Sequence, residues 1–207
     1  MDLTSPLPTA LTGLALGLAL IAAIGPQNIF VLRQGLCGDH VPSVLAICVG
    51  SDVIMIGAIT SAGRMVSDLP ATALTILRWG GVLYLTVFAL SAARRALRPT
   101  TLEVASAGRT RRGAVVRTTL ALTWLNPHTY VDLVLVVGPL TAAHGQHRWA
   151  FASGVLIAST LWFAALGLGT RVLRPLFRKP RTWRMLDTGV AITIAVMAVA
   201  LARSGPP

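Results

Sequence analysis

TWLNPHTYVD, at residues 123–132, lies within an apolar segment, about 114–138, that is long enough to cross a bilayer as a helix. Its polar groups are a carboxylate, an imidazole and an amide: Asp132, His128 and Asn126. Such groups are costly in hydrocarbon and are tolerated where they face a protein interior or a wet cavity. Pro127 has no N–H, and its ring displaces the carbonyl of Thr123 from its helical partner. The stretch therefore predicts an interrupted membrane helix near mid-membrane, where transporters commonly bind their cargo.

The composition indicates a polytopic membrane protein. Of 207 residues, 54% are apolar and 12% are charged, and the mean hydropathy of +0.71 is too high for a soluble domain. The net charge of +11 comes mainly from two windows, residues 94–117 and 171–184, which hold thirteen of the eighteen Lys and Arg. Both windows lie between apolar spans, and neither contains a recognisable nucleic-acid-binding motif. They are typical of cytoplasmic loops of a bacterial inner-membrane protein and do not indicate nucleic-acid binding.

Six membrane spans are predicted, at about 11–32, 43–66, 71–93, 114–138, 149–173 and 183–202. If both Arg-rich loops are cytoplasmic, both termini of a six-span chain lie outside. The orientation of the first span, and hence a count of five or six crossings, stays open because Asp2 is the only charged side chain before it.

The first span combines a packing pattern with a second break. Gly13 and Gly17 form a GxxxG pair, which predicts close helix packing. Farther on come Gly25 and Pro26, and the proline frees the carbonyl of Ala22. The two amides that follow, Gln27 and Asn28, favour a binding role because a packing kink needs neither of them.

Asp52 lies near the centre of the second span. One interpretation is a structural hydrogen-bond acceptor that pairs with Arg78 on a neighbouring helix. Its central depth, where a carboxylate is energetically unfavourable, favours the other interpretation, a role in binding substrate or protons.

Later spans add weaker candidates. His128 and Asp132 are four residues apart, so they share a helix face and could form a hydrogen bond. His128 then either satisfies a local hydrogen-bonding group or takes part in a proton relay. Ser159 and Trp162 share a face near the middle of the fifth span and are second-tier contacts, although membrane hydroxyls often bond back along their own helix.

No cofactor or metal is predicted. His144 and His147 have no third ligand nearby. Cys37 and Cys48 fit neither a disulfide framework nor a ligand spacing, so both are expected to be reduced and structural.

The chain forms two related halves within a single transmembrane domain, residues 1–207. Repeat one covers about 11–93, the Arg-rich loop about 94–113, and repeat two about 114–202. Each half opens with a helix broken by proline and flanked by amides. Since each half has three spans, the second enters from the opposite side, which gives an inverted repeat. The fold class is therefore an all-α polytopic membrane protein whose first and fourth helices are broken.

Five motifs, in order, carry a resemblance over essentially the whole chain: GPQN at 25–28, RQG at 33–35, SD at 51–52, WGG at 79–81 and TWLNPHTYVD at 123–132. Together they resemble the LysE/ArgO family of bacterial inner-membrane lysine and arginine exporters. The resemblance implies export of basic amino acids, driven by the membrane potential or by exchange with protons. Some members of the wider superfamily export neutral amino acids, which is the alternative substrate.

The hypothesis for the mechanism is alternating access by rocking one repeat against the other. The predicted substrate-binding residues are Gln27, Asn28, Asp52, Asn126, Tyr130, Asp132, Ser159 and Trp162. Proton coupling is assigned to Asp52, Asp132 and His128, and the helix breaks to Gly25, Pro26 and Pro127. A passive channel would spread polar residues along a pore, and an intramembrane enzyme would need a partnered nucleophile or a metal cluster. The expected partners are an amino-acid substrate and membrane lipids, and a homodimer is compatible with so small a chain.

Overall fold

The computed structural model describes residues 5–22, 25–38, 40–63, 70–97, 111–173 and 180–203. Each element in these ranges is a helix. In chain order they are α1 (Pro6–Ile21), α2 (Pro26–Cys37), α3 (Val41–Ala62), α5 (Ala71–Leu97), α6 (Arg112–Trp124), α7 (Pro127–Val131), the π-helix η1 (Asp132–Val137), α8 (Gly138–Ala143), the 3₁₀ turn η2 (Gly145–His147), α9 (Arg148–Leu173) and α10 (Pro180–Arg203). The predicted all-helical fold is confirmed for these ranges. Arg64, and residues 98–110 and 174–179 of the Arg-rich windows, lie outside the described residues.

Three segments are long and apolar enough to cross a membrane on their own: Val41–Ala62, Ala71–Arg94 and Gly145–Thr170. A fourth crossing results if Arg112–Trp124 and His128–Ala143, which are bent by 42°, are counted as one broken span. The predicted first span instead contains two shorter helices, α1 and α2. Multiple crossings are therefore supported, whereas the count of six and the inverted repeat stay predictions.

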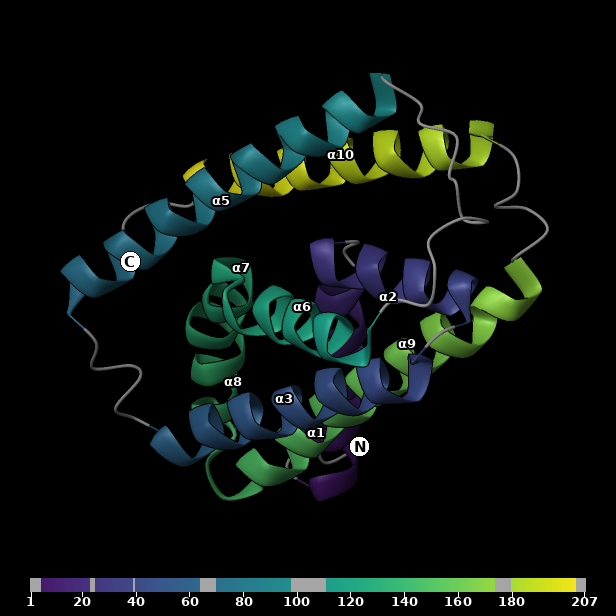
Figure 1. Cartoon of the computed structure of the whole chain (residues 1–207). Helices are drawn as coiled ribbons and strands as arrows, with labels where there is room; N and C mark the ends of the chain where they lie inside the picture. Colours follow the sequence, from purple (N-terminus) through teal and green to yellow (C-terminus); the bar gives the residue numbers. More distant parts are fainter. Residues whose placement is uncertain are drawn as a thin grey trace.

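The helices form two groups (Figure 1). α5 and α10 lie side by side as an antiparallel pair, and the other helices gather below them in the view. Within that second group α9 packs against α1, α2 and α3, and α3 also packs against α6. The pair touches the second group mainly at α7, where a Cβ on Gly81 would lie 2.9 Å from the Cγ2 of Val131. Each half of the chain therefore contributes helices to both groups.

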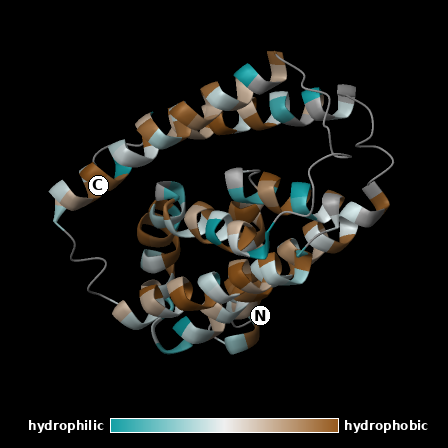
Figure 2. Ribbon diagram, viewed as in Figure 1, coloured by the Kyte–Doolittle hydropathy of each residue, from teal (hydrophilic) through white to brown (hydrophobic). Residues whose placement is uncertain are grey.

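Apolar side chains cover the outside of the molecule as well as its interior. On α5, Ile76, Leu83 and Val87 are more than half exposed, and on α10 so are Ile192 and Val196. Figure 2 shows hydrophobic residues along the helices, including their outward faces. A surface of this kind is suited to lipid acyl chains, which require no polar contacts.

The tightest crossing joins α1 to α9. A Cβ on Gly17 would lie 2.7 Å from the Cβ of Ala158, and one on Gly13 would collide with the backbone of Phe151. From the other side, a Cβ on Gly154 would collide with the carbonyl oxygen of Ala10. The predicted packing role of Gly13 and Gly17 is confirmed. Cys48 is fully buried, and the side chain of Cys37 lies outside the described part of the chain.

We predict that Gly154→Ala destabilises the protein. The added methyl group meets backbone atoms that cannot rotate away, and overpacking of this kind costs about 1–3 kcal/mol. Gly169→Ala on the same helix is the matched control, since nothing lies within 4 Å of its Cβ position. That change should be neutral or stabilise by about 0.5–1 kcal/mol. Thermal unfolding in detergent measures the stability of both variants. Equal stability of the two would contradict the close packing of α1 against α9 at Gly154.

Candidate functional site

Two helix breaks frame the site. α1 ends at Ile21, Gly25 is extended with φ −94° and ψ −177°, and α2 begins at Pro26. In the second half, α6 ends at Trp124 and α7 begins at Pro127. Proline suits the first position of a helix because the missing N–H would have no intrahelical acceptor there. The chain therefore starts a new helix at each of the two prolines.

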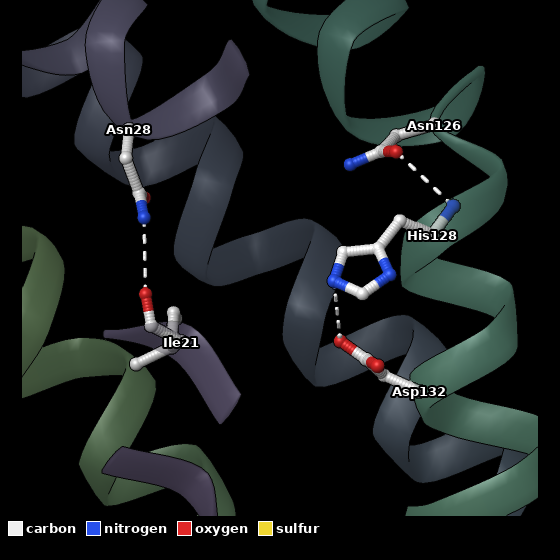
Figure 3. A network of polar contacts seen from close by, with 5 residues as sticks. All are labelled: Ile21, Asn28, Asn126, His128 and Asp132. Carbon is white, nitrogen blue, oxygen red and sulfur yellow. Dashed lines mark hydrogen bonds and ion pairs between the residues drawn. The ribbon is translucent and has the colours of Figure 1, made fainter. Parts of the chain in front are cut away.

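A side chain beyond each proline reaches back to the last carbonyl of the preceding helix. The Nδ2 of Asn28 donates to the carbonyl oxygen of Ile21 at 3.0 Å (Figure 3). The Oη of Tyr130 donates to the carbonyl oxygen of Trp124 at 2.8 Å. Because an unpaired carbonyl is costly away from water, these two bonds stabilise the interrupted backbone.

Asn126 caps the short helix α7. Its Oδ1 accepts a hydrogen bond from the backbone N–H of His128 at 3.1 Å. Asn28 and Asn126 are both 6% exposed. In this arrangement the two asparagines therefore stabilise the backbone at the breaks, in addition to the substrate contacts predicted for them.

Two carboxylates point into the same region from different helices. On α3, Asp52 accepts a hydrogen bond from the hydroxyl of Ser159 on α9. At the start of η1, the Oδ2 of Asp132 lies 3.5 Å from the Nε2 of His128, as the four-residue spacing predicted (Figure 3). The alternative partner for Asp52, Arg78, instead donates to the carbonyl oxygens of Leu201 and Ala202 at 2.9 and 2.6 Å. Arg78 thus ties the start of α5 to the end of α10.

These groups surround two adjoining cavities. The larger, of about 120 Å³, has polar walls formed by Gln27, Asp52, Thr129, Asp132 and Ser159. The smaller, of about 80 Å³, has polar walls formed by Gln27, Asn28, Asn126, His128, Thr129 and Asp132. Residues shared by the two linings place the cavities next to each other, between the breaks. The structure therefore gathers six of the eight predicted substrate-binding residues, together with His128.

The other two predicted contacts, Tyr130 and Trp162, line neither of these cavities in the described chain. Tyr130 lines a separate, apolar pocket of about 310 Å³ together with Trp124. Trp162 packs against the buried cluster that contains Val31, Val44 and Phe163.

Thr129 was not among the predicted site residues, yet it lines both polar cavities. It stands inside the TWLNPHTYVD stretch, but nothing in the sequence distinguishes its hydroxyl from the others in the spans, since membrane hydroxyls usually bond to their own helix. Trp124 is the last residue of α6, directly before the second break. Its Nε1 donates to the Oγ of Ser51 at 3.0 Å, which connects the second break to α3 beside Asp52.

The LysE type translocator family model matches residues 18–205. The chain belongs to this family. Among curated relatives, the "Lysine exporter LysE" of Corynebacterium efficiens is 36% identical, covering 94% of this chain and 98% of its own length. The "Arginine exporter protein ArgO" of Salmonella newport is also 36% identical, covering 93% and 92%. A "Putative amino-acid transporter" of Mycobacterium tuberculosis H37Rv is 38% identical, covering 91% and 94%.

Membership in this family makes the chain a multi-pass membrane transporter and not an enzyme, as its sequence predicted. No solved structure matches the chain.

For this LysE-family chain we predict that Asn28→Leu lowers stability. The substitution removes the donor to the Ile21 carbonyl, and leaving a buried acceptor unpaired costs about 1–3 kcal/mol. Unfolding in detergent without added amino acid measures the effect. If Asn28 acted only as a ligand for substrate, the variant would unfold at the wild-type temperature.

Proposed function

We propose that this chain exports basic amino acids, arginine or lysine, across the bacterial inner membrane by alternating access. The observation that carries the proposal is the pair of half-buried carboxylates, Asp52 and Asp132, that line one cavity. Relatives named lysine exporter and arginine exporter support the choice of substrate.

The two carboxylates suit the charges of the substrate. Arginine and lysine each carry a cationic side chain and an α-ammonium group, and a charge taken out of water requires an opposite charge and hydrogen bonds. Asp52 from α3 and Asp132 from the broken helix provide acceptors on two sides of the cavity. At about 120 Å³ the cavity is smaller than the roughly 300–1,000 Å³ of typical ligand pockets. The helices around it must therefore separate to admit an amino acid.

Helix contacts support an inverted repeat. α9 packs on α1 and α2, the broken helices of the first half, and α3 packs on α6 and η1 of the second half. Asp52 and Ser159, which bond to each other, are each the twelfth residue of α3 and α9. An inverted repeat would bring equivalent positions together in this way near its axis.

The same contacts indicate which helices move relative to each other during alternating access. Rocking one three-helix half against the other would separate α1 from α9 at a crossing where glycines bring the two backbones together. It would also break the Arg78 bonds from α5 to α10. We therefore assign the movement to the α5–α10 pair, shifting against the group that contains α1, α3 and α9.

Export needs an energy source. Moving one positive charge outward against an inside-negative potential costs about 2.3 kcal/mol per 100 mV. A returning proton offsets this cost. Asp52, Asp132 and His128 would bind the proton in alternation with substrate, with the Arg-rich windows 94–117 and 171–184 on the cytoplasmic side.

We predict that Asp52→Asn and Asp132→Asn each abolish arginine and lysine efflux while the protein still inserts. Either substitution keeps the shape and removes the charge that pairs with the cation and the proton. Asp187→Asn is the matched control, because Asp187 is likewise an acidic residue shielded from solvent, at 6% exposure, but lies on α10 and lines neither polar cavity in the described chain. Efflux from loaded cells, normalised to the amount of membrane-inserted protein, gives the comparison. Full activity of either site variant would remove that carboxylate from the mechanism.

We further predict that purified protein in liposomes exchanges labelled arginine and lysine, and that an inwardly directed proton gradient accelerates net efflux. Counterflow of arginine, lysine, leucine and threonine identifies the substrate class. Efflux with and without a proton-conducting uncoupler, at a clamped membrane potential, tests the coupling. Preference for leucine or threonine would favour the neutral amino-acid alternative. Non-saturable flux of all four amino acids would indicate a channel.

A further inference from the structure

Three polar residues next to the helix breaks line the polar cavities: Gln27, His128 and Thr129. The Nε2 of Gln27 and the Nδ1 of His128 are buried without a hydrogen-bond partner in the described chain. Gln27 directly follows Pro26 at the first break, and His128 directly follows Pro127 at the second. Both residues line the cavity of about 80 Å³ between the breaks.

The third group is the hydroxyl of Thr129. Nearby threonines donate to a carbonyl four residues back, as Thr123 does to Thr119 and Thr141 does to Val137. Within the described residues Thr129 makes no such bond. The break explains why, since the residue four positions earlier, Leu125, has left helical geometry with φ −96° and ψ 9°. Its hydroxyl is therefore available where it lines both polar cavities.

Buried groups of this kind need a partner. A buried polar group without a partner costs about 1–3 kcal/mol, so the unpartnered nitrogens of Gln27 and His128 beside the Thr129 hydroxyl are explained best by a ligand that completes their hydrogen bonds. Gln27 and Thr129 provide uncharged donors, and His128 provides a further donor when its ring is protonated. Such donors match an anionic group, whereas Asp52 in the larger cavity matches a cationic one.

We propose that Gln27, His128 and Thr129 form the subsite that binds the α-carboxylate of the exported amino acid. The inference rests on the proposed function only in requiring that the substrate is an amino acid, whatever its side chain. Asp52 lies on the cationic side of the site, and Asp132 lines both cavities, at the junction of the two sides.

Asp132 also orients the imidazole. Its Oδ2 lies 3.5 Å from the Nε2 of His128, so the ring turns its other nitrogen, Nδ1, away from Asp132 (Figure 3). In an imidazolium both nitrogens donate, and Asp132 then holds Nε2–H while the substrate carboxylate accepts from Nδ1–H. The amino acid is thereby bound in one orientation, with its two poles in different cavities.

The test compares each amino acid with the amine that lacks its carboxylate. Unlabelled lysine and cadaverine, or arginine and agmatine, compete against labelled lysine in counterflow by the intact protein in liposomes. Wild-type protein should bind cadaverine at least about tenfold more weakly than lysine, the effect of losing hydrogen bonds to a charged group. Equal affinity of the two compounds would overturn the subsite.

Substitutions locate the effect. Thr129→Val and Gln27→Met each remove a donor at nearly constant volume, and each should weaken lysine about tenfold while leaving the weaker affinity for cadaverine unchanged. Thr129→Ser, which keeps the hydroxyl, should restore lysine affinity. Thr119→Val is the matched control, since its hydroxyl bonds to the Val115 carbonyl outside both cavities.

Two results would contradict the proposal: equal weakening of lysine and cadaverine by both substitutions, or no weakening of either. If Thr129→Val does not insert, Gln27→Met makes the same comparison. If wild-type protein prefers a neutral amino acid, leucine and isoamylamine replace lysine and cadaverine. An error in the proposed side-chain specificity is thereby separated from an error in the carboxylate subsite.

Discussion

Backbone polar groups find no partner in hydrocarbon, so a helix can be interrupted at membrane depth only where the protein supplies the missing hydrogen bonds. Both interruptions in this chain meet that requirement in the same way. Asn28 reaches back seven residues to Ile21, and Tyr130 reaches back six residues to Trp124. In each half, a side chain of the second helix satisfies the last carbonyl of the first. The breaks are therefore supported locally, and the neighbouring side chains are free for other tasks.

Helix geometry separates those tasks. Successive residues on a helix point about 100° apart, so a side chain that turns back to the break is followed or preceded by one that faces elsewhere. On α2, Asn28 bonds to the backbone and lines only the smaller cavity, while Gln27 lines both. On α7, Tyr130 bonds to the backbone while Thr129 lines both cavities. Stabilisation of the break and formation of the polar cavity are thus achieved by adjacent residues.

The polar residues that are energetically unfavourable in lipid predicted much of this arrangement. Asp52, Asp132 and the amides beside two prolines had no place in lipid, and they lie around one pair of cavities. The partner of Arg78 could not be predicted, since the carbonyls it binds are 123 and 124 residues away and depend on how α5 packs on α10. The packing of Trp162 against the cluster of Val31, Val44 and Phe163 depends on the tertiary fold in the same way. A shared helix face at mid-span does not reveal which neighbouring helix fills the space in front of it.

The contact between the two helix groups lies next to the polar site, so the proposed movement of the α5–α10 pair would affect the site directly. Gly81 on α5 lets the pair approach the side chain of Val131 closely. Val131 is the residue before Asp132 on the broken helix that also carries Thr129. In the proposed movement, a shift of α5 and α10 would press on the segment that holds one carboxylate of the site, while Asp52 would stay on α3, whose neighbour α9 is held against α1 by glycine contacts. The distance between the two carboxylates would then depend on the position of the α5–α10 pair, which is the coupling that the proposed alternating access requires.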